Sequence, residues 1–391
     1  MSIMDESIKV CLKGKSDIIS DILATFSAYL SVYEGTMFSV DIKSDGRYLF
    51  REEDNIMQRF KDILCVMAPD LKVKDALERA VGLAGNNNAR LTVVEVVDEI
   101  PPNTKLLDRV LSPYDLQAKI VSEHRQRLEE LITPWRNKNV EIQVKVLSGI
   151  PFLEIIKEVL RNKLDLVIKA ADCSGALDRV FCSNDMHLLR KCPCPVWLVQ
   201  SESPKDYQRI LAAVDVDDSF SPEELKVRHL LNLQILEMAS SLALSEFAEL
   251  HIIHTWEAIG ESVMYGGFIT MSKDEITSYV EEVRQRHNKN LNVLIDEMNR
   301  KLEKTTLEHT KPQTHLLKGS PCNKIPALAE ELNASLVVMG TVAHTGISGL
   351  FMGNTAETIL NHIDCPILAI KPPGFETPVA LEDQDIDNRN A

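Results

Sequence analysis

The sequence predicts an α/β fold made of two tandem Rossmann-like units, each a five-stranded parallel sheet with helices on both faces. Short apolar runs alternate with helical patterns along most of the chain, which is typical of βα units around a parallel sheet. Runs such as 166–168 and 336–338 are apolar on both faces, as a sheet covered on both sides requires. The same order of elements also occurs twice, in 61–200 and in 208–372.

The repeat rests on segments that match in the same order in both halves. The matching pairs are 61–67 with 208–214, 91–94 with 250–253, 149–151 with 319–321, and 194–196 with 365–367. An amphipathic helix with apolar residues at i, i+3, i+4 and i+7 follows the third segment of each half, over 152–159 and 325–332. We infer a duplication and call the halves the first copy and the second copy.

The pattern also predicts how the copies join. Long helices are expected over 113–138 and 273–305. The polar linker 201–206 is short, so the copies should pack as a pseudo-symmetric pair. We expect antiparallel pairing of their closing strands, near 194–200 and 365–371, and not one continuous sheet in a single domain.

Four parts are predicted: an N-terminal extension of helix plus hairpin (1–58), the first copy (59–200), the second copy (207–373) and an acidic disordered tail (374–391). In the extension, strands 38–42 and 47–50 flank the turn 44–46. Ser16 can cap a helix with an apolar face made of Ile19, Ile22, Leu23, Phe26 and Leu30. We expect this face to dock on the first copy or, with preference, across a homodimer, so that truncation to residue 58 converts dimer to monomer in light scattering.

Composition excludes several functions. The 43 Lys and Arg residues face 58 Asp and Glu residues, a net charge of −15, which disfavours nucleic acid as a partner. No secretory signal or membrane-length apolar run occurs, so we expect a cytoplasmic protein without a membrane partner. The eight cysteines, including the close pair Cys192 and Cys194, fit buried reduced thiols.

The stretch 337–357 carries the clearest functional signal. An apolar run stops at Gly340, a small-residue loop follows, and a helix opens at Gly353-Asn354-Thr355. Such a segment can hold phosphates on backbone N–H groups and a helix dipole. Its spacing resembles the Gly-x2-Gly-x9-Gly-(Ser/Thr) signature of the universal stress protein family, with Ala343 at the middle glycine and Asn354 before the hydroxyl residue.

The resemblance covers most of 61–372 and includes the strand end 254–256 and the turn 317–321. It implies ATP as the ligand, with Mg2+ only alongside the nucleotide. Asp215 would face the adenine, Thr255 would line the same cleft, and Gly340 would let the backbone approach the phosphates. The implied binding residues are Ala213, Val214, Asp215, Thr255, Met339, Gly340, Ala343, Gly353, Asn354 and Thr355. If Ala343 must adopt positive φ, its methyl group weakens binding about tenfold.

The first copy lacks this signature. Ala170, Cys173 and Cys182 stand where the second copy has Gly340, Ala343 and Gly353, and Pro69 near the aspartate position removes a backbone donor. We therefore expect at most one ATP or ADP per chain.

Three functions remain open: a stress-response module that binds a nucleotide or another small ligand, a slow ATPase or adenylyl-transfer enzyme, and a scaffold for a hydrophobic or lipid-like ligand. Beyond Asp215, the loop region offers no identifiable general base or nucleophile, so we assign no catalytic residue and favour the binding module. His251 and His254, three apart on a strand, point to opposite faces and cannot share a metal, and no metal ligands are assigned.

Overall fold

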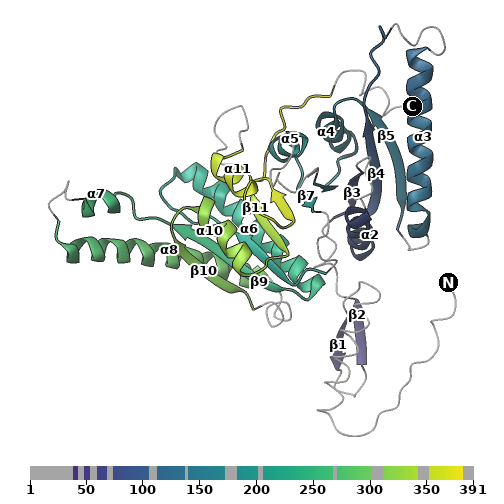
Figure 1. The fold of residues 1–391 in the computed structure, drawn as a ribbon. Coiled ribbons are helices and arrows are strands. Elements are labelled where there is room, and N and C mark those ends of the chain that lie inside the picture. The colour runs from purple at the N-terminus through teal and green to yellow at the C-terminus, as the bar shows by residue number, and fades with distance from the viewer. Residues whose placement is uncertain are drawn as a thin grey trace. The chain divides into compact units, whose positions relative to one another are not determined.

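The computed structural model divides into two compact units, Met1–Arg59 and Phe60–Ala391, which we treat separately (Figure 1). The described residues are 38–42, 48–52, 60–67, 74–104, 112–136, 140–171, 183–200, 206–266, 271–301, 311–341 and 352–381.

In the N-terminal unit, β1 (Phe38–Ile42) pairs antiparallel with β2 (Tyr48–Glu52), with Val40 opposite Phe50. This confirms the predicted hairpin. The predicted turn 44–46 and the helix with its apolar face from Ile19 to Leu30 lie outside the described residues, so the docking of that face stays a prediction.

The elements of the two copies follow the predicted alternation. In the first copy they are β3 (Asp62–Met67), α2 (Lys74–Asn87), β4 (Arg90–Val97), α3 (Pro113–Ile132), the short 3-10 helix η2 (Thr133–Trp135), β5 (Ile142–Ser148), α4 (Pro151–Asn162), β6 (Leu166–Ala170), α5 (Ser183–Lys191) and β7 (Val196–Val199). In the second they are β8 (Arg209–Ala213), α6 (Pro222–Glu246), β9 (Glu249–Trp256), α7 (Glu261–Tyr265), α8 (Lys273–Lys301), β10 (Gln313–Lys318), α10 (Pro321–Glu331), β11 (Leu336–Gly340), α11 (Asn354–Leu360) and β12 (Ile367–Ile370).

The helix predicted over 113–138 is shorter than expected. The α-helix α3 ends at Ile132, and the tighter turn η2 follows it. Pro134 explains the change, because its ring removes a backbone donor and obstructs the α-helical hydrogen bond to the preceding turn. Its counterpart α8 extends through Lys301, the last described residue before 311.

Among the described residues of the larger unit, the strands form one ten-stranded sheet in the order β10-β9-β8-β11-β12-β7-β6-β3-β4-β5. Pairing within each copy is parallel. The copies meet where β12 pairs antiparallel with β7, with Ala369 opposite Val196. This is the predicted join, but the expectation of two separate sheets is wrong. Backbone hydrogen bonds between two edge strands extend a sheet across the join instead of ending it.

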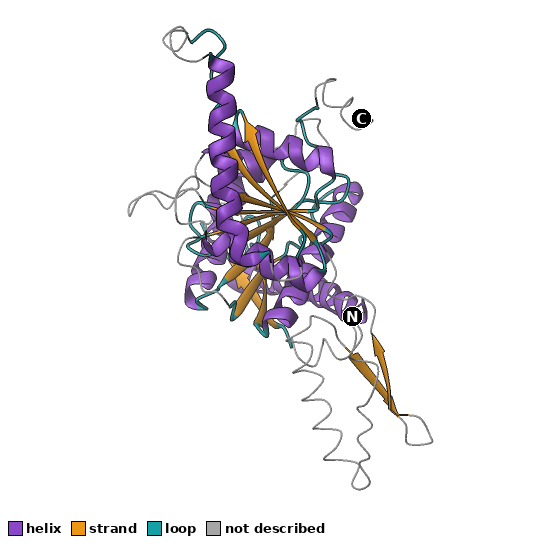
Figure 2. Cartoon of the chain, turned by 90° about the vertical axis from the view of Figure 1, so that its right-hand side faces the viewer, coloured by secondary structure: helices purple, strands orange, loops and turns teal. Residues whose placement is uncertain are grey.

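The apolar core continues across the join as well. Helices cover both faces of the strands (Figure 2). Helices α2, α3, α6 and α8 pack on one face of the sheet, and α4, α5, α10 and α11 pack on the other. Each of the two buried apolar layers contains residues of both copies; Trp197 and Ile210, for example, share the first layer. The two copies are therefore joined through both faces of one sheet.

Candidate functional site

The candidate site lies where β8 and β11 end side by side. These strands pair in parallel, with Met339 opposite Ala213, and both side chains are buried on the α10–α11 face. The chain leaves β8 toward β9 on one side, while β11 lies on the other side of β8. Such a reversal of strand order opens a crevice at the carboxyl ends of the strands, where open α/β sheets bind ligands.

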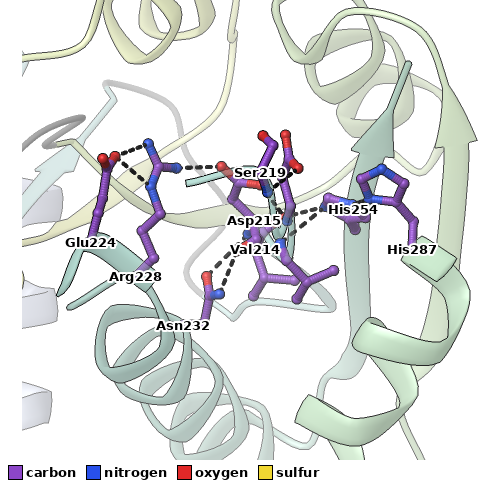
Figure 3. A network of polar contacts seen from close by, with 10 residues as sticks. Val214, Asp215, Ser219, Glu224, Arg228, Asn232, His254 and His287 are labelled. Atoms are coloured by element: carbon purple, nitrogen blue, oxygen red, sulfur yellow. Dashed lines mark hydrogen bonds and ion pairs between the residues drawn. The ribbon is translucent and has the colours of Figure 1, made fainter. Parts of the chain in front are cut away.

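Asp215 stands at this edge with its carboxylate already oriented (Figure 3). One oxygen accepts from Arg228 Nη1 at 2.5 Å, and the other accepts from the Asp217 backbone N–H at 3.1 Å. Arg228 reaches over from α6, where Glu224 pairs with its guanidinium at 2.9 Å and the Phe220 ring lies 3.6 Å from its central carbon. The Asp215 side chain remains about half exposed (49%), so it can also accept from a ligand.

Asn232 fixes the backbone of Asp215. Its side-chain oxygen accepts from the Asp215 N–H at 3.0 Å, and its side-chain nitrogen donates to the Asp215 carbonyl at 2.6 Å. Helix α6 begins at the N-cap Ser221, followed by Pro222, and buries Asn232 among leucines. Neither Asn232 nor Arg228 was among the residues predicted from the sequence. A buried amide within the apolar run 230–233 was the available signal, because buried polar groups need hydrogen-bond partners.

A pair of buried histidines lies behind Val214. His254 Nδ1 lies 3.2 Å from the Val214 carbonyl oxygen, and His254 Nε2 lies 2.9 Å from His287 Nδ1 (Figure 3). Burial lowers the pKa of His254, with the nearby charge of Asp215 acting in the opposite direction. The pair therefore holds the end of β8 from the α8 side.

Thr255, the predicted binding residue on β9, is half-buried near the end of that strand, opposite Leu317 of β10. His251 lies on the face opposite His254 and contacts His315, with the ring nitrogens 3.0 Å apart. The prediction that His251 and His254 cannot share a metal agrees with these separate contacts. No cluster of potential metal ligands occurs within the part of the chain that the structure describes.

Gly340 is the last residue of β11, and helix α6 packs against it. A Cβ added here would stand 2.6 Å from Cδ2 of Leu231 in α6, much closer than carbon atoms approach. The glycine is thus already explained by the packing of Leu231. The predicted role of Gly340, close approach of the backbone to phosphates, is therefore not needed to explain the residue.

Gly353, Asn354 and Thr355 lie at the start of α11. The Gly353 N–H donates to the Thr341 carbonyl at 3.3 Å, which ties this start to the end of β11. No side chain caps α11, and Asn354 and Thr355 are exposed. Ala343 lies outside the described residues. The structure thus brings Gly353 next to β11 and Gly340 next to β8, at the edge where Asp215 stands.

These features define a class of protein: a tandem α/β chain whose second copy has a candidate ligand site at the switch point of its strand order. Residues 59–200 and 206–371 each match the universal stress protein family. The chain therefore belongs to the universal stress protein family.

Known relatives share the tandem arrangement. Universal stress protein E of Escherichia coli (strain K12) is 31% identical over 340 residues, which cover 85% of this chain and 100% of that protein. The universal stress protein E homolog of Haemophilus influenzae is 28% identical over 326 residues and is covered to 98% of its length.

Solved structures agree with the fold. A functionally unknown protein from Pseudomonas aeruginosa PAO1 is 25% identical, with a TM-score of 0.60, covering 82% of this chain and 95% of that chain. A universal stress protein from Archaeoglobus fulgidus has a TM-score of 0.51 at 18% identity, covering 79% and 97%, and supports the fold alone. Within the described residues, no helix is long and apolar enough to span a bilayer.

Proposed function

We propose that this protein is a cytoplasmic stress-response module that binds ATP at the β8–β11 edge of its second copy and acts as a regulator rather than as an enzyme. The oriented carboxylate of Asp215 at the switch point is the observation that carries the proposal. Arg228, Asp217 and Asn232 fix its position before any ligand arrives, which lowers the entropic cost of binding.

The residues at this edge fit a nucleotide. Asp215 keeps exposed acceptor capacity for the amino or hydroxyl hydrogens of a nucleoside. The exposed Asn354 and Thr355 supply polar groups for the phosphates, and Gly353 adds no side chain there. Mg2+ would arrive with the nucleotide, since Asp215 already pairs with Arg228.

The same contacts favour binding over catalysis. His254, the histidine that contacts the end of β8, is only 2% exposed behind Val214. A general base needs access to the proton that it removes. The scaffold alternative has one supporting observation, because the Leu231 contact already explains Gly340 without a phosphate.

Isothermal titration calorimetry with ATP tests the proposal. We expect one site per chain, abolished in Gly353→Asp, because a carboxylate would stand where the phosphates bind. The matched control Cys182→Asp, at the corresponding position of the first copy, should leave the affinity unchanged. Two equivalent sites, or unchanged affinity in Gly353→Asp, would contradict the assignment. Mass spectrometry of the native protein separates the alternatives, since a copurifying apolar molecule would favour the scaffold.

A further inference from the structure

We propose that the first copy positions the two chain segments that flank the glycine loop of the second copy, and that Lys371 is the positioning residue. This inference rests on the proposed function and names the role of the copy that lacks the nucleotide signature. The flanking segments are the end of β11, at Thr341, and the start of α11, at Gly353.

Thr341 is the point where several contacts meet. It is fully buried, and its N–H donates to the Ile370 carbonyl at 3.3 Å. Its carbonyl accepts from the Gly353 N–H at 3.3 Å, and its hydroxyl accepts from Lys371 Nζ at 2.6 Å. A shift of Thr341 would therefore shift Gly353 as well.

Lys371 connects this point to the first copy. Lys371 comes directly after β12 in the chain and is 5% exposed. Its Nζ also donates to the carbonyl oxygen of Leu189. Leu189 lies in the last turn of α5, where helix carbonyls have no partner within the helix and attract donors. Burial lowers the pKa of Lys371 to about 7. Both the ammonium and the neutral amine carry N–H donors, so the contact is available in either state.

The neighbouring residue of α5 holds the other flank. Arg190 Nη2 lies 2.6 Å from Glu357 Oε1 in the first turn of α11, and the Glu357 N–H donates to the Gly353 carbonyl at 3.0 Å. Leu189 and Arg190, consecutive in the first copy, thus contact the segments on both sides of residues 342–351.

The corresponding residue of the first copy makes a different contact. Gln200 follows β7 as Lys371 follows β12, and its side-chain amide donates to the Ile363 carbonyl at 3.5 Å. The lysine that contacts Thr341 thus belongs to the copy that carries the candidate site.

The test compares Lys371→Met, which keeps the length and burial of the side chain, with Glu246→Gln. Glu246 of α6 pairs with Arg79 of α2 and so joins the copies on the other face of the sheet.

Three quantities are measured: the Kd of ATP, the Kd of adenosine, and the rate of hydrogen exchange of the Gly353 amide without ligand. For Lys371→Met we expect about tenfold weaker ATP binding, unchanged adenosine binding and faster Gly353 exchange. For Glu246→Gln we expect all three to stay at the wild-type value.

Unchanged exchange and ATP affinity in Lys371→Met would overturn the inference, as would equal effects in Glu246→Gln. If the wild-type protein does not bind ATP, the proposed function fails, and the exchange comparison alone then decides this inference. If Lys371→Met does not fold, the partly exposed Arg190→Gln replaces it, with an expected loss of about threefold in ATP affinity and faster Gly353 exchange.

Discussion

The first copy holds a buried ion pair at positions where the second copy has two uncharged side chains. Lys169 of β6 and Asp185 of α5 lie 2.8 Å apart, with Asp185 fully buried. The strand register within each copy aligns Lys169 with Met339, and the matching C-P-V and C-P-I segments align Asp185 with Ala356. The two charges of this pair offset one another inside the first copy, whereas neither Met339 nor Ala356 carries charge. The same fold therefore holds a buried charged pair at this position only in the first copy.

The largest expected effect comes from breaking that pair. Asp185→Ala should lower the free energy of unfolding by about 3 kcal/mol, because Lys169 stays buried after losing its carboxylate. The double variant Lys169→Met/Asp185→Ala, which carries the residues of the second copy, should recover most of the loss. Urea unfolding measures both. A double variant no more stable than the single one would show that the pair is not what distinguishes the copies here.

The reciprocal exchange tests the candidate site. Met339→Lys/Ala356→Asp gives the second copy the pair of the first, and we expect at least about tenfold weaker ATP binding, or about 1.4 kcal/mol. The cause is the burial of a larger, charged pair where Met339 and Ala356 now pack, which shifts the start of α11 and the groups proposed to hold the phosphates. The control is Lys169→Met/Asp185→Ala, which should leave ATP affinity unchanged. Full affinity in the exchanged second copy would show that this pair does not explain the absence of a site in the first copy.

A second difference lies on the opposite face of the sheet. Glu95 of β4 is fully buried and pairs with Arg127 and with His124, whose Nδ1 lies 3.1 Å away. The register of the sheet aligns Glu95 with His254, which contacts His287 instead. A strand position that carries a carboxylate in one copy thus carries an imidazole in the other, and the neighbouring long helix supplies a histidine in both.

This difference predicts that acid destabilises the protein through the second copy. The pKa of His254 is lowered from its usual 6.5 by burial. The unfolded chain then binds protons more readily than the folded chain, so stability falls as the pH drops below about 6.5. The side chains that contribute charge near His254 are His287 of α8 and Asp215 and Asp217 beyond β8.

Urea midpoints from pH 7.5 to 5.5 measure the effect. The wild-type midpoint should fall with acidification, and His254→Gln, which cannot titrate at this position, should show a shallower slope. His315, His187 and Lys371, whose pKa values are also lowered by burial, contribute to the slope in both proteins. Identical slopes in the two proteins would exclude His254 as the source.

The fold could be predicted from the sequence because it depends on patterns among residues that are close together in the chain. Apolar runs, helix periodicity and the matching segments of the two copies gave the strands, the hairpin β1–β2 and the antiparallel join. The residues that orient the site depend on how distant elements meet. Arg228 and Asn232 matter because α6 crosses the end of β8, and Lys371 contacts Leu189 across 182 residues of sequence. Gly340 shows the same limit, since only the packed structure brings Leu231 against it.

The smallest expected effect concerns the geometry of one cation. Arg228→Lys keeps the charge beside Asp215 but loses the planar group that contacts Asp215, Glu224 and Phe220 together. Because the pair is partly exposed, we expect only about two- to fivefold weaker ATP binding, or about 0.5–1 kcal/mol. Calorimetry measures it against Arg284→Lys, which alters a similar pair with Glu281 on the exposed surface of α8. A loss equal to that of the control would mean that Asp215 is oriented without Arg228, by Asn232 and the Asp217 N–H alone.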